Sequence, residues 1–170
     1  MLENKKIWIA LVALAAGARL LPHPWNFWPM IGLGLFAGAK AAKASTGVLA
    51  TLAAMLLSDA VLGFHSGMWF VYLALLLPVW LGRQIRAHQT VANIAAGALG
   101  SSVFFFLFTN FVVWVRSHTY THNAAGLAAC YAAAIPFFQN QLLGDAFYTA
   151  VLFGGYALFH RLRAPSPQTA

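Results

Sequence analysis

Long apolar stretches with almost no charged side chains constrain this chain most strongly. Residues 91–115, for example, contain no Asp, Glu, Lys or Arg. Over the whole sequence 61% of the residues are hydrophobic and only 8% are charged, whereas a soluble domain has roughly 25% charged residues. The sequence therefore lacks the polar surface of a water-soluble globule, and it predicts an all-α membrane protein with one compact domain.

Six apolar segments are expected to form the helices of a transmembrane bundle. They cover residues 7–21, 30–39, 46–64, 68–82, 91–115 and 142–159. A spanning helix needs about 20 residues, so the first, second and fourth segments are short. Residues 124–138 are also apolar and could form a re-entrant or interfacial helix, a question that the sequence leaves open. We predict a single transmembrane domain over residues 1–164 and a disordered polar tail over residues 165–170.

The distribution of Lys and Arg predicts the orientation of this bundle. Cytoplasmic loops of membrane proteins carry an excess of these residues. With a cytoplasmic N-terminus, eight of the ten basic residues fall on the cytoplasmic side, namely Lys5, Lys6, Lys40, Lys43, Arg83, Arg86, Arg161 and Arg163. Only Arg19 and Arg116 fall towards the outside. We therefore predict that both termini are cytoplasmic.

Arg19 opens a stretch that interrupts the helical pattern. Residues 19–29 read RLLPHPWNFWP, and its prolines prevent a helix from continuing through it. An arginine at membrane depth is costly unless a carboxylate pairs with it. The chain has only three acidic residues, and Glu3 lies at the terminus. We therefore expect Arg19 to form an ion pair with Asp59 or Asp145.

The predicted topology brings polar side chains from separate helices to the same outer depth. The candidate substrate-binding residues are Arg19, His23, Asn26, Asp59, Asn110, Asn140, Asp145 and Tyr148. All of them except His23 and Tyr148 are expected to border one large cavity in the outer half. Buried polar groups need hydrogen-bond partners. These residues can supply only some of those partners to one another, which leaves donors and acceptors free to bind a ligand. The alternative is that the charges form a purely structural ion pair.

The sequence contains no motif of a catalytic or cofactor site. A P-loop, a dinucleotide-binding fingerprint and a nucleophile elbow are all missing, so we predict neither an enzyme nor a cofactor. His118 and His122 lie four residues apart, and Cys130 follows eight residues later. Without an accompanying acidic residue in the motif, these three are weak candidates for metal ligands, and the alternative is a polar loop.

Small residues recur four positions apart in the apolar segments, as at Gly34 and Gly38. This spacing lets helices approach closely, and packing inside the bundle is the simplest explanation of any one pair. The first helix is the best candidate for a surface that docks a partner, through Ala10, Ala13 and Gly17.

Four segments of the chain resemble an uncharacterised family of small bacterial inner-membrane proteins that are usually labelled as candidate transport proteins. They are residues 19–29, residues 56–65 (LLSDAVLGFH), residues 109–114 (TNFVVW) and residues 126–148 (GLAACYAAAIPFFQNQLLGDAFY). The architecture also resembles the S-components of energy-coupling factor (ECF) vitamin transporters. That resemblance implies six helices, cytoplasmic termini, an outward-facing pocket, and a first helix that docks a coupling subunit.

These observations predict a substrate-binding component for uptake of a small molecule, similar to a vitamin or cofactor precursor. The chain has no nucleotide-binding motif, so partner ATPases acting through an ECF-type coupling subunit, or an ion gradient, would supply the energy. The basic residues are dispersed and have an explanation in topology, so we expect the lipid bilayer as a partner and no nucleic acid. The alternative is a membrane-embedded structural or assembly subunit.

Overall fold

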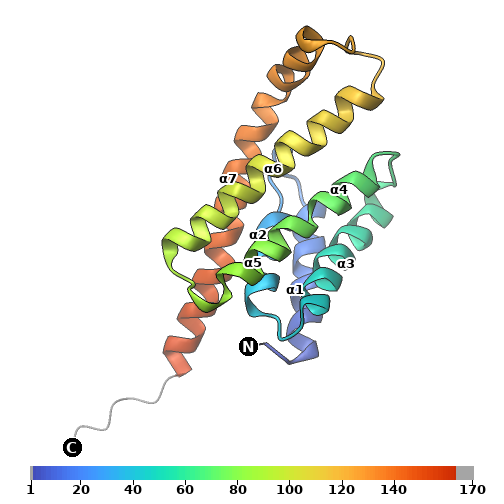
Figure 1. The fold of residues 1–170 in the computed structure, drawn as a ribbon. Coiled ribbons are helices and arrows are strands. Elements are labelled where there is room, and N and C mark those ends of the chain that lie inside the picture. The colour runs from blue at the N-terminus through green and yellow to red at the C-terminus, as the bar shows by residue number, and fades with distance from the viewer. Residues whose placement is uncertain (1, 164–170) are drawn as a thin grey trace, which may run out of the picture.

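The computed structural model describes residues 2–163, and the regular elements in this part of the chain are helices (Figure 1). In chain order they are α1 (Lys5–Leu20), α2 (Met30–Lys40), α3 (Ala44–Leu62), α4 (Met68–Ala74), α5 (Leu76–Gln84), the 3-10 helix η1 (Ile85–Ala87), α6 (Val91–Arg116) and α7 (Ala124–Arg163). Only Leu75 separates α4 from α5, and η1 follows directly. The described chain therefore contains six helical segments, which confirms the predicted all-α architecture.

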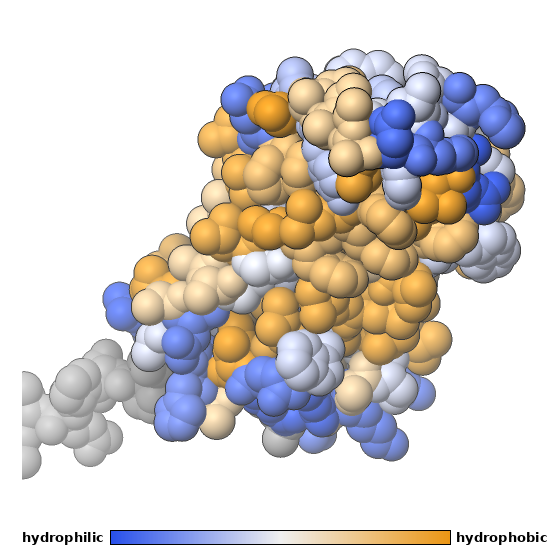
Figure 2. All heavy atoms as spheres, turned by 45° about the horizontal axis from the view of Figure 1, so that its top comes forward, coloured by the Kyte–Doolittle hydropathy of each residue, from blue (hydrophilic) through white to orange (hydrophobic). Residues whose placement is uncertain are grey.

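Four of the six segments are long and apolar enough to cross a membrane. They are Ala44–Leu62, Met68–Ala87, Val91–Arg116 and Ala124–Arg163. Figure 2 shows the corresponding surface, a broad apolar band between two polar ends. The other two segments are shorter, with 16 residues in α1 and 11 in α2. Length and composition are thus those of a membrane protein.

Helix α2 forms the centre of the bundle, because every residue from Met30 to Ala39 is buried. Its backbone lies directly against that of α5. A Cβ atom added at Gly38 would overlap the carbonyl oxygen of Val79, and one added at Gly82 would overlap that of Leu35. Helix α2 can be only 11 residues long because neighbouring helices, rather than lipid, surround it. The small residue at 38 therefore serves packing inside the bundle.

The predicted basic end of the bundle is present in the structure. The N–H of Leu2 donates to the carbonyl oxygen of Lys40 at 2.9 Å, and Arg83 Nη1 donates to that of Ala41 at 3.0 Å. The Lys40 ammonium lies 4.0 Å from the ring centroid of Tyr156 near the end of α7. Figure 1 shows both ends of the described chain on this side. The cytoplasmic assignment of this end stays a prediction.

Helix α7 answers one question that the sequence leaves open. It runs without interruption over 40 residues, so residues 124–138 do not form a separate re-entrant or interfacial helix. At a rise of 1.5 Å per residue its length is about 60 Å, roughly twice the thickness of the hydrocarbon core of a bilayer. The predicted tail over residues 165–170 lies outside the described residues.

Packing against α6 explains why α7 continues through Pro136. A proline removes one hydrogen bond from a helix, but membrane helices tolerate it where neighbouring helices hold the chain. On one side of Pro136 the Tyr131 hydroxyl donates to the carbonyl oxygen of Leu107 at 2.8 Å. On the other side Phe138 stacks on Phe106, with ring centroids 4.3 Å apart. Contacts with α6 therefore fix both halves of the helix.

Candidate functional site

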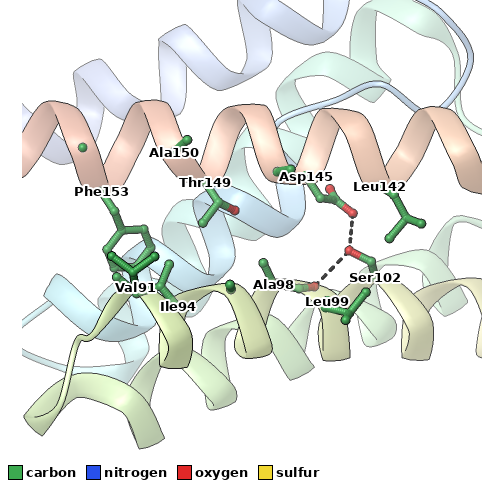
Figure 3. Close-up of a pocket in the computed structure, with 13 residues that line it drawn as sticks. Val91, Ile94, Ala98, Leu99, Ser102, Leu142, Asp145, Thr149, Ala150 and Phe153 are labelled. Carbon is green, nitrogen blue, oxygen red and sulfur yellow. Dashed lines mark hydrogen bonds between the residues drawn. The ribbon is translucent and has the colours of Figure 1, made fainter.

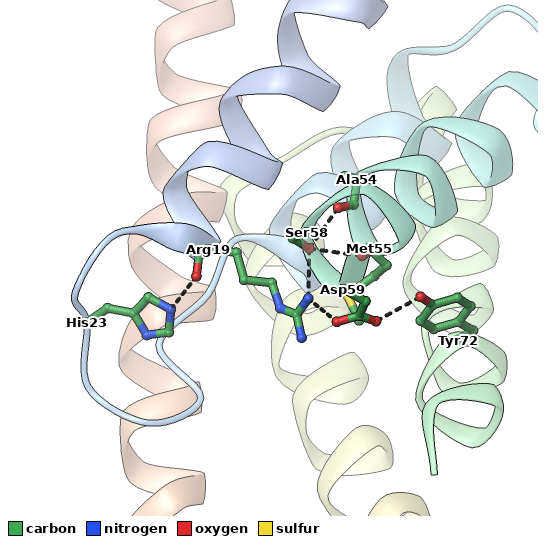
Figure 4. Close-up of polar contacts among 7 residues, drawn as sticks. All are labelled: Arg19, His23, Ala54, Met55, Ser58, Asp59 and Tyr72. Carbon is green, nitrogen blue, oxygen red and sulfur yellow. Dashed lines mark hydrogen bonds and ion pairs between the residues drawn. The ribbon is translucent and has the colours of Figure 1, made fainter. Parts of the chain in front are cut away.

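The predicted ion pair forms between α1 and α3. Arg19 Nη1 donates to Asp59 Oδ1 and, at 2.7 Å, to Ser58 Oγ (Figure 4). The second carboxylate oxygen of Asp59 accepts a hydrogen bond from the Tyr72 hydroxyl of α4 at 2.7 Å. Asp59 is 1% exposed and the Arg19 side chain 11%. The expectation that Arg19 pairs with Asp59 or Asp145 is thus confirmed for Asp59, and this network joins three helices.

The prolines that follow α1 place Arg19 in its last turn. Helix α1 ends at Leu20, because the residue before Pro22 is sterically driven out of the helical region. The chain then loops back through Asn26, which adopts a positive φ of 64°, a conformation that Asn tolerates better than most residues. Helix α2 begins directly after Pro29. Arg19 therefore lies in the last turn of α1, facing the end of α3.

The loop after Arg19 encloses a hollow of about 490 Å³, which we call the Arg19 hollow. Its walls are Arg19, Leu20, Leu21, Pro22, His23, Trp25, Asn26, Trp28 and Leu62. The Arg19 guanidinium lies 5.0 Å from the centroid of the Trp28 ring. The Trp28 indole N–H is buried and has no hydrogen-bond partner among residues 2–163. His23 is held by its own loop, since Nε2 lies 3.1 Å from the carbonyl oxygen of Arg19.

Asp145 lies in a different place, in a groove between α6 and α7 (Figure 3). We call it the α6–α7 groove. It has a volume of about 460 Å³, and its walls are mostly Ala, Leu, Ile, Val and Phe side chains. Asp145 is 1% exposed. Its Oδ2 lies 2.6 Å from Ser102 Oγ, whereas its Oδ1 has no partner in the described chain. Among residues 2–163 the only salt bridge joins Asp59 to Arg19, so Asp145 has no basic partner in this part of the chain.

The expected single cavity is therefore wrong. Arg19 and Asn26 line one hollow, while Asp145 lines the α6–α7 groove. Asn110 donates to the carbonyl oxygen of Phe106 in its own helix at 2.8 Å, and Asn140 is only partly buried. A side-chain amide that donates to a backbone carbonyl oxygen of its own helix does not require a partner from another helix.

Aromatic packing separates the two places. Trp28 presents its face to Arg19 and contacts Phe105 of α6 in a T-shaped arrangement, with ring centroids 5.7 Å apart. Tyr148, another predicted binding residue, packs against Phe27 with centroids 5.7 Å apart. These rings fill the space in which the sequence predicted a shared cavity.

The three weak candidates for metal ligands, His118, His122 and Cys130, do not form a common site. Cys130 is buried and its Sγ donates to the carbonyl oxygen of Asn110 at 3.5 Å. His122 Nε2 lies 3.0 Å from the carbonyl oxygen of Trp114, and His118 is exposed. Within residues 2–163 no three His, Cys, Asp or Glu side chains could hold a metal ion.

The proposed docking face of α1 is open. Ala10, Ala13 and Gly17 are exposed, and a Cβ atom at Gly17 would meet no atom within 4 Å. Leu14 lies on the same face and is 70% exposed. This face is free of contacts inside the bundle, so it is available to lipid or to another helix, and docking stays a prediction.

Sequence reasoning missed the residues around Asp145. Gln141, Asp145 and Thr149 follow one another at intervals of four, and all three are buried. Gln141 Nε2 donates to the carbonyl oxygen of Ser102 at 3.0 Å. The spacing of four places these polar residues on one helix face, and this signal, opposite Ser102 in an apolar α6, could have identified the polar contact between the helices.

Comparison with known proteins gives a family but no characterised relative. No curated protein matches the chain. No solved structure matches it either. The sequence profile described as "Family of unknown function (DUF6580)" matches residues 2–167, nearly the whole chain. The protein therefore belongs to the family of unknown function DUF6580.

Proposed function

We propose that this protein is the substrate-binding component of a small-molecule uptake system in the bacterial inner membrane. The observation that carries the proposal is the Arg19 hollow, where a fixed guanidinium and the side chains of Trp25 and Trp28 line about 490 Å³ of space. The basic end of the bundle, with Lys40 and Arg83, faces the cytoplasm by the positive-inside rule. The hollow lies at the opposite end and opens to the outside.

The chemistry of the hollow suits a planar molecule that carries hydrogen-bond acceptors. A guanidinium has five N–H donors, and the contacts of Arg19 in the described chain use Nη1 alone. Asp59 neutralises the charge and holds the group in place. The indole of Trp28 and that of Trp25 offer flat apolar faces. Vitamins and cofactor precursors with a ring and a carbonyl or carboxylate group have this combination.

The energy for uptake comes from partner proteins in this proposal. The open face of α1, formed by Ala10, Ala13 and Gly17, lets another helix approach closely. An ECF-type coupling subunit with its ATPases is the partner that this face would dock. The protein itself binds and releases the substrate and catalyses no reaction.

A second candidate function is a structural or assembly subunit of a membrane complex. The completeness of the Arg19 network favours it, since both carboxylate oxygens of Asp59 have partners from other helices. In that case the hollow holds no specific molecule, and the ion pair only joins α1, α3 and α4.

Two tryptophan substitutions separate these functions. Trp28→Phe replaces the indole that lines the hollow by a smaller aromatic ring and removes its N–H. Trp8→Phe is the matched control, because Trp8 is also buried but donates to the carbonyl oxygen of Leu2 at the basic end. Small molecules that co-purify with each variant from bacterial membranes are identified by mass spectrometry.

The uptake proposal predicts one compound at near-stoichiometric amounts in the wild type and in Trp8→Phe. Its occupancy falls about two- to tenfold in Trp28→Phe, since the smaller ring loses an aromatic contact worth roughly 0.5–1.5 kcal/mol. Equal occupancy in both variants, or no bound compound in protein of normal abundance, contradicts it and favours the structural subunit.

A further inference from the structure

The α6–α7 groove holds a buried carboxyl group that the proposed function leaves without a role. Asp145 is deeply buried, has no basic partner in the described chain, and lies in a mostly apolar groove with Ser102 and Gln141 as neutral polar neighbours (Figure 3). A bare carboxylate in such surroundings is strongly disfavoured. A basic side chain or a bound proton must therefore neutralise the carboxylate, and the hydrogen bonds around Asp145 indicate a proton.

Ser102 supplies the decisive geometry. Its Oγ lies 2.9 Å from the carbonyl oxygen of Ala98 and 2.6 Å from Asp145 Oδ2. A serine hydroxyl has one proton to donate, and a backbone carbonyl oxygen can only accept. If Ser102 donates to Ala98, the short contact with Asp145 is a full hydrogen bond only when Asp145 itself donates. A proton on Oδ2 satisfies both contacts at once, in the order Asp145 to Ser102 to Ala98.

We propose that Asp145 is a proton-binding site between α6 and α7, protonated in this conformation. The remaining oxygen, Oδ1, and the hydroxyl of Thr149 one turn along α7 are both buried and without partners among residues 2–163. Both belong to residues that line the α6–α7 groove. They can accept and donate to water when the proton leaves, so release to water yields a carboxylate that the groove can hydrate.

The helices that pack around Asp145 place no competing charge beside it. Helix α6 has no titratable side chain before Arg116 at its end, and α2 has only Lys40, which lies over Tyr156 at the basic end. On α7 the nearest titratable group is Tyr148. The loop before α2 carries His23, which bonds to the backbone of Arg19 and Pro24.

One basic and one acidic side chain, Arg19 and Asp59, lie near that loop and form a salt bridge with each other. Neither is therefore available to Asp145. The groove extends from Asp145 and Ser102 to Val91 at the start of α6. The proton therefore exchanges with the basic end of the bundle, away from the Arg19 hollow.

Proton binding itself does not depend on the proposed uptake function. The further step, that loss and gain of this proton drives the change between substrate-binding and substrate-releasing states, rests on that function. In the deprotonated state the Ser102 hydroxyl turns its proton from the carbonyl oxygen of Ala98 to the carboxylate, so the hydrogen bond between α6 and α7 reverses its direction.

Infrared spectroscopy tests the site directly, because the chain has only three acidic side chains. The carbonyl stretching band of a protonated carboxylic acid is recorded for the purified full chain in detergent at pH 7. We expect one such band in the wild type and in Glu3→Gln, and its loss in Asp145→Asn. Ser102→Ala keeps the acid but removes its acceptor, so the band stays and shifts to higher frequency.

Three results would overturn the proposal. They are absence of the band from the wild type at pH 7, its persistence in Asp145→Asn, and its displacement by added sodium chloride against a choline chloride control. The last result would make the groove a metal-cation site instead. The outcome is independent of ligand retention in Trp28→Phe, so failure of the uptake function and failure of the proton site are distinguishable.

Discussion

The two buried carboxyl groups of the bundle predict losses of very different size from the same substitution. Asp59 forms a salt bridge with Arg19 and accepts a hydrogen bond from Tyr72, whereas Asp145 has only the neutral polar groups of Ser102 and Gln141 beside it. Changing either aspartate to asparagine keeps the size and removes the carboxyl group. The difference in unfolding free energy between the two variants therefore measures the difference between an ion pair and a protonated acid.

For Asp59→Asn the expected loss is about 3 kcal/mol. Removing one partner of a buried ion pair typically costs roughly 3–5 kcal/mol, because the other charge is left uncompensated. The lower end applies here, since the Arg19 side chain is 11% exposed and borders the Arg19 hollow, where water can reach it. In Asp145→Asn the amide N–H can donate to Ser102 Oγ as the protonated acid does, so we expect a loss under about 1 kcal/mol.

The assay is reversible unfolding of the detergent-solubilised protein, followed by tryptophan fluorescence. Glu3→Gln is the matched control for loss of an exposed acid and should leave the free energy unchanged within about 0.5 kcal/mol. The double variant Arg19→Gln/Asp59→Asn removes the stranded charge and should be more stable than Asp59→Asn alone. The reasoning is refuted if Asp145→Asn costs as much as Asp59→Asn, or if Asp59→Asn is as stable as the wild type.

Three other predictions concern the fold. Gly38→Ala should strongly reduce the amount of folded protein, because the new Cβ overlaps the backbone of α5, whereas Gly17→Ala meets no atom and should be neutral; equal thermal stability of the two variants would contradict the packing. A reporter fused within residues 117–123 should report the outer side and one fused after residue 170 the cytoplasm; a cytoplasmic signal from the loop would reject the orientation. Pro136→Ala should keep or raise stability by up to about 1 kcal/mol, since α7 is already continuous through this position and alanine restores the missing backbone donor; loss of folding would show that the proline is required.

Composition and charge predicted the helical bundle well, for reasons of membrane physics. Backbone groups in lipid must bond within their own segment, so apolar runs of this kind have few alternatives to a helix. The ion pair of Arg19 was predictable for a similar reason, because only Asp59 and Asp145 were available as partners. The sequence could not decide which of these two aspartates pairs with Arg19.

The parts that sequence reasoning missed depend on packing between distant segments. Helix α7 continues through Pro136, and beside the proline Phe138 stacks on Phe106 of α6, a contact that no local pattern reveals. The single outer cavity failed because Asn110 bonds within its own helix and aromatic rings fill the space between Arg19 and α6. Common depth in a membrane does not imply a common site, since each polar group can find a partner locally.

The central claim is that the Arg19 hollow binds the transported molecule. The most direct test is an experimental structure of protein purified from bacterial membranes with its co-purified compound. The account predicts density for a planar molecule in the Arg19 hollow, in contact with the Arg19 guanidinium and with the tryptophan side chains that line the hollow. An empty hollow, in protein whose bound compound instead occupies the α6–α7 groove beside Asp145, would contradict it.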